Sequence, residues 1–431
     1  MTEAYLILIV VLAIVAVSSV FFKNQEGKVT PMIFVAAVVA SLIAGMGIRV
    51  REIVEGPFAY LDSAMWVLCG MLFVTMLADN GTFEYLFNKL IGKKRGATAQ
   101  MILLLLFIAI PGMLTGTAAA CVATTGLMVG RYLLGKGVEK AKAVELVAVG
   151  SLLGMLMPPL CLPAMTVVVG RQGSYPASFE GYFVPLLILA LPALLVYGAL
   201  SGKRILGETG AEPAAVQTGS PLCLLPILVV GLLLLAHNFL YFATPFLGYP
   251  LIYMIGFILA IFVNAKKASP LESAARGVRI VAPAVALMFA TGAISEVLTM
   301  VGSHGTLSTA LVLGDVSPVV LSVVCMLALT LSGLVLGGPF AFTVSAVCSY
   351  LIGALVYPNS EMALVASGAA LAVAMFLSAR GGLIGTTCDT LEVSGVSSKQ
   401  ILQKSAVPVG LVLLVSLIFA FAYASVRFLM V

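Results

Sequence analysis

The chain has 431 residues, of which 61% are hydrophobic and only 10% are charged. A soluble domain has about 45–50% apolar and about 25% charged residues, so this composition excludes an ordinary soluble protein. The net charge of +5 is too small, and too little of the chain is polar, to provide a soluble basic surface for nucleic acid. We therefore predict an all-α polytopic membrane protein embedded in a lipid bilayer.

Membrane helices need about 20 apolar residues to cross the hydrocarbon core. Ten stretches meet this requirement or nearly do: residues 4–22, 30–48, 62–78, 144–170, 182–200, 221–240, 249–264, 280–300, 361–396 and 406–428. The stretches 144–170 and 361–396 are long but interrupted, which predicts two broken helices.

The basic residues favour one orientation. Eighteen of the 23 Lys and Arg residues fall in six short connections, and cytoplasmic connections are the ones enriched in such residues. This predicts that both termini are periplasmic. The six groups are Lys23/Lys28, Lys89/Lys93/Lys94/Arg95, Arg131/Lys136/Lys140/Lys142, Lys203/Arg204, Lys266/Lys267/Arg276/Arg279 and Lys399/Lys404.

Two further apolar regions, 98–134 and 318–356, are predicted to be re-entrant hairpins. Both flanks of 98–134 are basic, so the region enters and leaves by the cytoplasmic face. Its first arm, 98–110, reaches about 20 Å as a helix, which does not cross a core of about 30 Å. The predicted tips are 111–117 and 332–339, both rich in Gly and hydroxyl residues. A short amphipathic stretch, 82–95, is expected to lie in the interface.

The two halves of the chain repeat the same order of elements. Glycines at positions 81, 112 and 116 recur 221 residues later, at 302, 333 and 337. Because each half has five spans, the second half is predicted to be inverted relative to the first, as in many secondary transporters. The predicted boundaries are 1–200 for the first repeat, 201–220 for a cytoplasmic linker and 221–431 for the second repeat.

The hairpin tips and helix breaks are the candidate binding sites. Irregular backbone at membrane depth is tolerated only beside protein or a water-filled cavity, and it supplies free carbonyls and amides. The breaks are expected at 154–163, around Pro158-Pro159, and at 378–387. Na⁺ prefers oxygen ligands, so nearby hydroxyls are candidates, although a Ser or Thr also often bonds back onto its own helix. These hydroxyl residues are Thr115, Thr117, Thr124, Thr125, Ser332, Ser378, Thr386 and Thr387.

Arg380 is an ionisable residue inside a predicted span, which by default indicates a functional role. Its guanidinium is suited to bind a carboxylate through two hydrogen bonds. The alternative is an internal ion pair with Asp389 or Glu392. Glu296, near the outer end of its predicted span, is a further candidate for cation or proton coupling, with a carboxylate that extends to the interface or is capped as the alternative. With two His residues and no catalytic motif, the sequence does not favour an enzyme, a cofactor or a metal site beyond Na⁺.

Two segments of the first half resemble a known family. GMLTGTAAACVATTG at 112–126 and GSLLGMLMPPLCLPAMTVVVG at 150–170 are similar to the hairpin tip and the Pro-Pro break of the large permease subunit of tripartite ATP-independent periplasmic (TRAP) transporters. The following Phe183-Val184-Pro185-Leu186 is also similar. The resemblance implies an elevator-type transporter of a bacterial or archaeal inner membrane that takes up an organic acid with Na⁺.

The resemblance also implies two partners, a small four-helix membrane subunit and a periplasmic substrate-binding protein. It places cation ligands at Gly112, Thr115, Gly116, Pro158 and Pro159. By the repeat, a second cation site is expected at Gly333, Gly337, Ser378 and Gly381. Substrate contacts are expected from Arg380, Thr117, Ser332 and Thr386.

The second half departs from the family pattern. It has Ser378-Ala379-Arg380-Gly381 where the family has another Pro-Pro, and it lacks a Thr-Pro-Thr-Glu stretch near 290–300. An alternative is therefore a carrier of the same superfamily that works without a binding protein, as a dicarboxylate or citrate symporter or a cation/proton antiporter. A membrane receptor or scaffold is disfavoured, because it would not explain two hairpins and two breaks.

Overall fold

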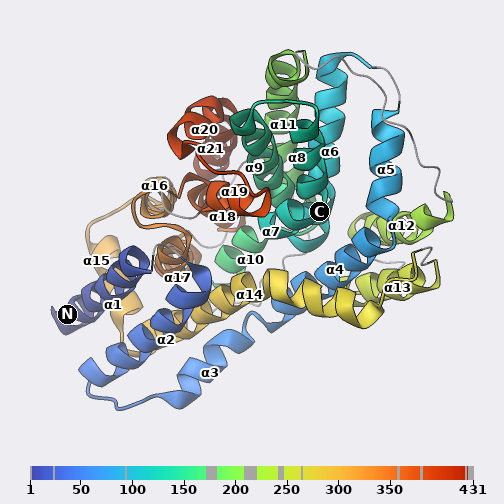
Figure 1. Cartoon of the computed structure of the whole chain (residues 1–431). Helices are drawn as coiled ribbons and strands as arrows, with labels where there is room; N and C mark the ends of the chain where they lie inside the picture. The colour runs from blue at the N-terminus through green and yellow to red at the C-terminus, as the bar shows by residue number, and fades with distance from the viewer. Residues whose placement is uncertain are drawn as a thin grey trace.

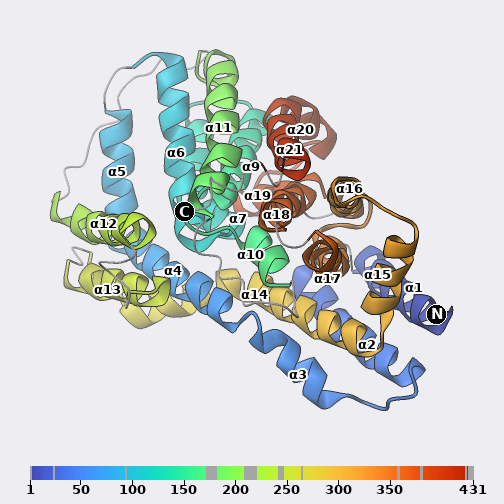
Figure 2. The same ribbon diagram turned by 180° about the vertical axis from the view of Figure 1, so that it is seen from behind.

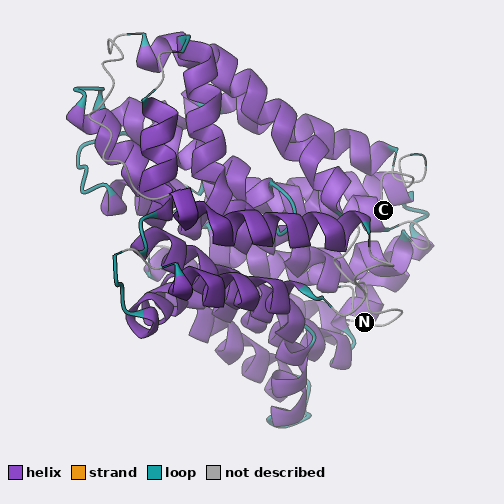
Figure 3. Ribbon diagram, turned by 90° about the vertical axis from the view of Figure 1, so that its right-hand side faces the viewer, coloured by secondary structure: helices purple, strands orange, loops and turns teal. Residues whose placement is uncertain are grey.

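The computed structural model describes residues 2–22, 25–92, 95–170, 182–207, 221–240, 247–263, 266–356, 360–378, 382–422 and 425. These residues form helices and no strand (Figure 3), which confirms the predicted fold class. Within them, nine helices are long and apolar enough to cross a membrane, or ten if α20 (Ser398–Lys404) and α21 (Ala406–Phe421) form one bent span.

One group of helices, which we call the scaffold, is built around α14 (Pro270–Met300). This 31-residue helix packs along α3 (Val50–Phe58) and α4 (Leu61–Asp79). The helices approach so closely at Gly56 and Gly292 that a Cβ on Gly56 would lie 2.4 Å from the Gly292 carbonyl oxygen. The other scaffold helices are α1 (Thr2–Phe21), α2 (Glu26–Ile43), α12 (Leu225–Phe239) and α13 (Tyr249–Phe262).

The remaining long helices form a second group, the core bundle, which lies against one side of the scaffold (Figures 1 and 2). Here α6 packs on α9 and α11, while α18 packs on α10, α16 and α21. Its members are α6 (Ala97–Thr115), α7 (Ala118–Cys121), the π-helical turn η1 (Val122–Gly126), α8 (Leu127–Gly135), α9 (Lys140–Leu156), α10 (Leu162–Val169), α11 (Phe183–Leu206), α16 (Pro318–Leu336), α17 (Gly338–Leu355), α18 (Glu361–Leu377), α19 (Leu383–Thr390), α20 and α21.

Two short helices connect the groups. The chain turns sharply after α4 and after α14 into α5 (Thr82–Ile91) and α15 (Ser303–Leu313), as Figures 1 and 2 show. Both turns are made by glycines in the left-handed region, Gly81 at φ +89° and Gly302 at φ +78°, where a side chain would be strained. Helix α5 contacts α6, and α15 contacts α17.

The described elements follow the same order in both halves. The series α4, α5, α6, α7–α8, α9, α10, α11 is matched by α14, α15, α16, α17, α18, α19, α21. Glycines 116 and 337, like 81 and 302, occupy corresponding turns with positive φ. The inversion of one repeat relative to the membrane stays a prediction, as do the domain boundaries.

The hairpin arms are longer than predicted. Helix α6 continues through Pro111 to Thr115, and its 19 residues reach about 28 Å rather than about 20 Å. Proline is tolerated inside a packed membrane helix, and here the Pro111 carbonyl accepts a hydrogen bond from the Thr115 hydroxyl at 2.8 Å. Helix α16 likewise continues to Leu336. The non-helical tips are therefore shorter than predicted and consist of residues 116–117 and of Gly337. Because the arms are long enough to approach the thickness of the hydrocarbon core, their length no longer supports the prediction that the hairpins are re-entrant.

Other boundaries also shift. Helix α14 begins at Pro270, ten residues before the predicted span, because Ser269 caps it and accepts from the Glu272 amide. Arg276 and Arg279 are thus in a helix, not in a connection. Helix α11 extends to Leu206, so the predicted linker 201–220 begins as helix, and residues 208–220 lie outside the described residues. The first break is confined to residues 157–161. Around the second, α18 ends at Leu377 and α19 begins at Leu383, and the structure describes residues 378 and 382 between them.

Candidate functional site

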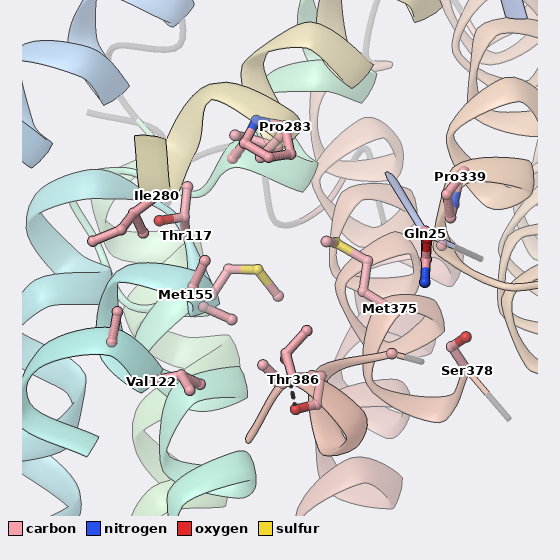
Figure 4. A pocket seen from close by; sticks show the side chains of 18 of the residues that line it. Gln25, Thr117, Val122, Met155, Ile280, Pro283, Pro339, Met375, Ser378 and Thr386 are labelled. Carbon is pink, nitrogen blue, oxygen red and sulfur yellow. Dashed lines mark hydrogen bonds between the residues drawn. The ribbon is translucent and has the colours of Figure 1, made fainter. Parts of the chain in front are cut away.

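A cavity of about 1020 Å³ lies between the core bundle and the scaffold (Figure 4). The first hairpin closes one side and the second half of the chain closes the other, with α14 across the top of the view. The lining residues are Val20, Gln25, Gly27, Gly116, Thr117, Ala118, Ala119, Val122, Ala123, Met155, Leu162, Ile280, Pro283, Ala284, Gly338, Pro339, Met375, Ser378, Gly382, Leu383, Thr386, Asp389 and Thr390.

The tip of the first hairpin brings two hydroxyls to the edge of this cavity. Helix α6 ends at Thr115, Gly116 turns the chain with φ +69°, and Thr117 is extended. The Thr115 and Thr117 hydroxyl oxygens are 3.0 Å apart, and both side chains are buried. Thr117 lines the cavity, whereas Thr115 lies behind it. The Thr115 hydroxyl donates to the Pro111 carbonyl, and its oxygen accepts from the Thr117 amide at 3.3 Å, so it ties the tip to the last turn of α6.

This tip is packed directly against the first helix break. The Leu162 amide donates to the Gly116 carbonyl at 2.9 Å, which joins the hairpin to the start of α10. A Cβ on Gly112 would lie 2.5 Å from the Gly154 carbonyl carbon, so only glycine fits there without a shift. The break itself contains a cis peptide bond between Pro158 and Pro159. The structure thus brings Gly112, Thr115 and Gly116 to the same junction as the break.

The second hairpin meets its own break in a similar way. Helix α16 ends at Leu336, the following Gly337 has φ +99°, and Gly338 and Pro339 line the cavity. A Cβ on Gly333 would lie 2.4 Å from the Ala374 Cβ near the end of α18. The Ser332 hydroxyl donates to the Leu329 carbonyl at 2.7 Å, and Ser332 does not line the cavity. Its predicted contact with substrate therefore has no geometric support here.

The second break supplies much of the polar surface of the cavity. Ser378 and Gly382 both line it, as does Thr386, whose hydroxyl donates to the Leu383 carbonyl at 3.0 Å (Figure 4). Arg380 and Gly381 lie outside the described residues. Gly382 and Leu383 begin α19, whose first amide groups have no partner within the helix and carry the positive end of its dipole.

Two kinds of lining residue were not predicted. Asp389 lies near the C-terminal end of α19, where it is exposed to the cavity. It follows Thr386 at helical spacing, so the sequence did contain a signal for a shared face. Gln25, Ile280 and Pro283 come from the scaffold, and no local pattern distinguished them. Glu296 is elsewhere on α14 and does not line the cavity.

The cavity is chemically mixed. Five side chains present hydroxyl or amide groups, namely Gln25, Thr117, Ser378, Thr386 and Thr390. Most of the others are apolar, and Asp389 is the single ionisable side chain among the described lining residues. No group of three or more His, Cys, Asp or Glu residues in the described part of the chain is suited to hold a metal ion. Such a site suits reversible binding of a small organic molecule.

Comparison with known families gives one match over most of the chain. The family model described as "Tripartite ATP-independent periplasmic transporter, DctM component" matches residues 5–353. The match includes the first hairpin, the first break and most of the second hairpin, and it ends at residue 353, before the second break. No curated protein matches significantly.

Solved transporters share the fold. The chain is similar to the YdaH transporter of Alcanivorax borkumensis, with a TM-score of 0.59 and 14% identity over 87% of this chain and 88% of that chain. It is also similar to MtrF of Neisseria gonorrhoeae, described within a class of antimetabolite efflux pumps, with a TM-score of 0.58 and 12% identity over 92% of this chain and 95% of that chain. At these identities the likeness shows the fold alone.

Proposed function

Since the chain belongs to the DctM family of tripartite ATP-independent periplasmic transporter components, we propose that it is the large membrane subunit that carries an organic acid across the inner membrane of a bacterial or archaeal cell. The observation that carries this proposal is the cavity bounded by both hairpins, the second break and the scaffold helix α14. Because the cavity lies between two groups of helices, movement of one group relative to the other can change the side of the membrane from which the cavity is accessible.

The substrate carboxylate is assigned to the second break. Ser378 and Gly382 line the cavity on both sides of the segment that contains Arg380. A guanidinium there and the amide groups at the start of α19 would both favour an anion. The Thr117 and Thr386 hydroxyls face the same space and are proposed to orient the acid.

Cation coupling, with Na⁺ as the proposed ion, is assigned to the two hairpin–break junctions. The first would use oxygen atoms at Gly112, Thr115 and Gly116, and at the break Pro158 and Pro159. The contact between the hairpin tip and α10 supports this set, because it brings the Gly116 carbonyl to the first break. The second would use Gly333, Gly337, Ser378 and Gly381. A bound cation would neutralise charge next to the acid and so favour its binding.

The assembly and the orientation are also part of the proposal. A DctM component is one of three parts, so we propose a small four-helix membrane subunit and a periplasmic binding protein as partners. From the distribution of Lys and Arg, we propose that both termini lie in the periplasm. Gln25, which precedes α2, and Gly27, in the first turn of α2, line the cavity, and the neighbouring Lys23 and Lys28 are assigned to the cytoplasm. The cavity then corresponds to an inward-facing site.

Thermal unfolding of the purified protein tests this function. A ligand that binds only the folded state raises its stability by RT ln(1 + [L]/Kd). We expect a rise in Na⁺ relative to K⁺ or choline, and a further rise with one carboxylate. Arg380→Ala should abolish the second rise and keep the first. A shift with pH but none with Na⁺ would rule out sodium coupling.

A stand-alone carrier is the second candidate. It is favoured by the family match ending at residue 353 and by the absence of a second Pro-Pro at 378–381. MtrF, whose fold is similar, is described as an efflux pump. Uptake into proteoliposomes that contain this chain alone, without a small subunit or a binding protein, would support this alternative. A strict requirement for both partners would exclude it.

A further inference from the structure

The position of Asp389 bears on which organic acids the cavity accepts. Asp389 is the single ionisable side chain among the described residues that line the cavity. Its carboxylate has the same sign of charge as the organic anion that the cavity is proposed to bind. No described residue forms an ion pair with Asp389, and its side chain is exposed. The neighbouring hydroxyls are already used, since Thr390 donates to the Thr386 carbonyl at 2.7 Å and Thr386 donates to Leu383.

Helix α19 gives the cavity two electrically different ends. Gly382 and Leu383, at its N-terminal end, and Asp389 and Thr390, at its C-terminal end, all line the cavity. The rise between Leu383 and Asp389 is roughly 9 Å along the helix axis. The helix dipole favours an anion at the first end and disfavours one at the second, where the Asp389 charge has the same sign.

We propose that Asp389 makes this site selective for monoanionic acids. The single carboxylate of the substrate would lie at the start of α19, and a hydrogen-bond donor at its other end, a hydroxyl or an ammonium group, would lie at Asp389. A second carboxylate at that end would be repelled. Two unit charges 4 Å apart in water repel by about 1 kcal/mol, which is about a fivefold loss of affinity, and more in a drier site. This inference rests on the proposed function, because it concerns the same cavity.

Three five-carbon acids that differ only at the far end test the proposal. They are 5-hydroxypentanoate, 5-aminopentanoate and glutarate, titrated into the purified full-length protein by calorimetry at one fixed Na⁺ concentration. The wild-type chain should bind the hydroxy acid at least about fivefold more tightly than glutarate. Comparison of 5-aminopentanoate with 5-hydroxypentanoate distinguishes an ammonium donor from a hydroxyl donor. Because its ammonium group would form an ion pair with Asp389, 5-aminopentanoate should bind most tightly of the three.

Asp389→Asn should bring the ratio between hydroxy acid and glutarate close to one, and it should weaken binding of the amino acid. Asp62→Asn, an exposed acidic residue at the start of α4 outside the cavity, is the matched control and should leave all ratios unchanged. Because the wild-type ratio needs no variant, a poorly folding substitution does not remove the test. Equal binding of all three acids by the wild type, or an unchanged ratio in Asp389→Asn, would overturn the role of Asp389 alone. Absence of binding by all three would contradict the proposed function as well.

Discussion

The two hairpin–break junctions have the same order of elements but different surroundings. In the first, Thr115 and Thr117 are buried, and the hairpin is bonded to α10 through Leu162 and Gly116. In the second, Gly333 packs on α18, but Ser332 is only half-buried, and α16 is less covered than α6. The described polar groups of the cavity come mainly from the second half. We therefore expect the first junction to be the more rigid of the two, and the second half to supply most of the polar contacts in the proposed site.

The largest expected effect tests the packing of the first half. The Glu145 carboxylate, on α9, is fully buried, forms an ion pair with Arg204 of α11 and accepts from the Tyr197 hydroxyl at 2.9 Å. The corresponding helices of the second half are α18 and α21. They also pack on each other, but buried residues of these two helices such as Val365 and Phe419 are apolar. Arg204→Ala should destabilise the protein by about 3 kcal/mol, because it leaves a buried charge without its cation. The apparent unfolding temperature measures this loss.

Lys203→Ala is the matched control, because Lys203 is exposed and adjacent in sequence. The double variant Glu145→Gln, Arg204→Ala should recover part of the loss, since it removes the buried charge. If Arg204→Ala and Lys203→Ala have equal effects, the ion pair does not stabilise the first half.

Alanine at the two hairpin glycines compares the junctions directly. A Cβ at Gly112 or Gly333 would come within 2.5 Å of a neighbouring atom, so both substitutions force a shift, which costs about 1–3 kcal/mol. We expect the larger loss at Gly112, because α6 is enclosed whereas the more exposed α16 can move outward. Gly410→Ala, which meets open space within α21, should be neutral or stabilising. Equal losses at both glycines would contradict the proposed difference in rigidity.

The contacts between the short helices and the hairpins differ in their response to pH. On α5, Phe83 packs edge-on against Phe107 with ring centroids 6.2 Å apart. The corresponding residue of α15, His304, stacks on Tyr350 at 4.4 Å, and its Nδ1 lies 2.8 Å from the Thr299 hydroxyl. Burial lowers the pKa of His304 to about 4. Because the folded-state pKa lies below the unfolded value, the contribution of His304 is fully present above about pH 6.5 and is lost as the pH falls towards 4.

Between pH 7 and pH 5, His304 should therefore reduce stability by about 2 kcal/mol. His304→Phe, which installs the residue found in the first half, should remove this part of the pH dependence. Unfolding curves at both pH values measure it. An identical pH dependence in the variant would show that other groups are responsible.

The smallest expected effects distinguish the residues that bind the cation from those that bind the substrate. Thr115→Val removes a hydroxyl at the first junction, and we expect about a fivefold increase in the Na⁺ concentration that gives half of the thermal shift. Thr386→Val removes a hydroxyl from the cavity and should weaken binding of the acid about fivefold at saturating Na⁺. Each variant should leave the other ligand unchanged under these conditions. If both variants alter the same ligand, the division between the junctions is wrong.

The candidate site was only partly predictable. Gly116, Thr117, Ser378 and Thr386 were selected from the sequence and line the cavity, because breaks and turns reveal themselves through Gly, Pro and hydroxyl residues. Their roles in binding stay predictions. The hairpin arms were predicted too short, since Pro111 reads as a helix end although neighbouring helices allow α6 to continue through it. Asp389 was considered only as a partner of Arg380, and Gln25 was missed, because its neighbours in the cavity are distant in sequence.

The sequence by itself determined the class of the protein, the approximate spans, the breaks and the recurring glycines. These depend on the length of apolar runs and on local backbone chemistry, which each segment carries alone. Only the tertiary structure decided which segments face one cavity, and that Asp389 of α19 shares it with Ile280 of α14 and Gln25. Packing between helices determines that arrangement. Contacts such as Gly56 with Gly292 and Gly112 with Gly154 depend on two backbones fitting together, which neither segment specifies without the other.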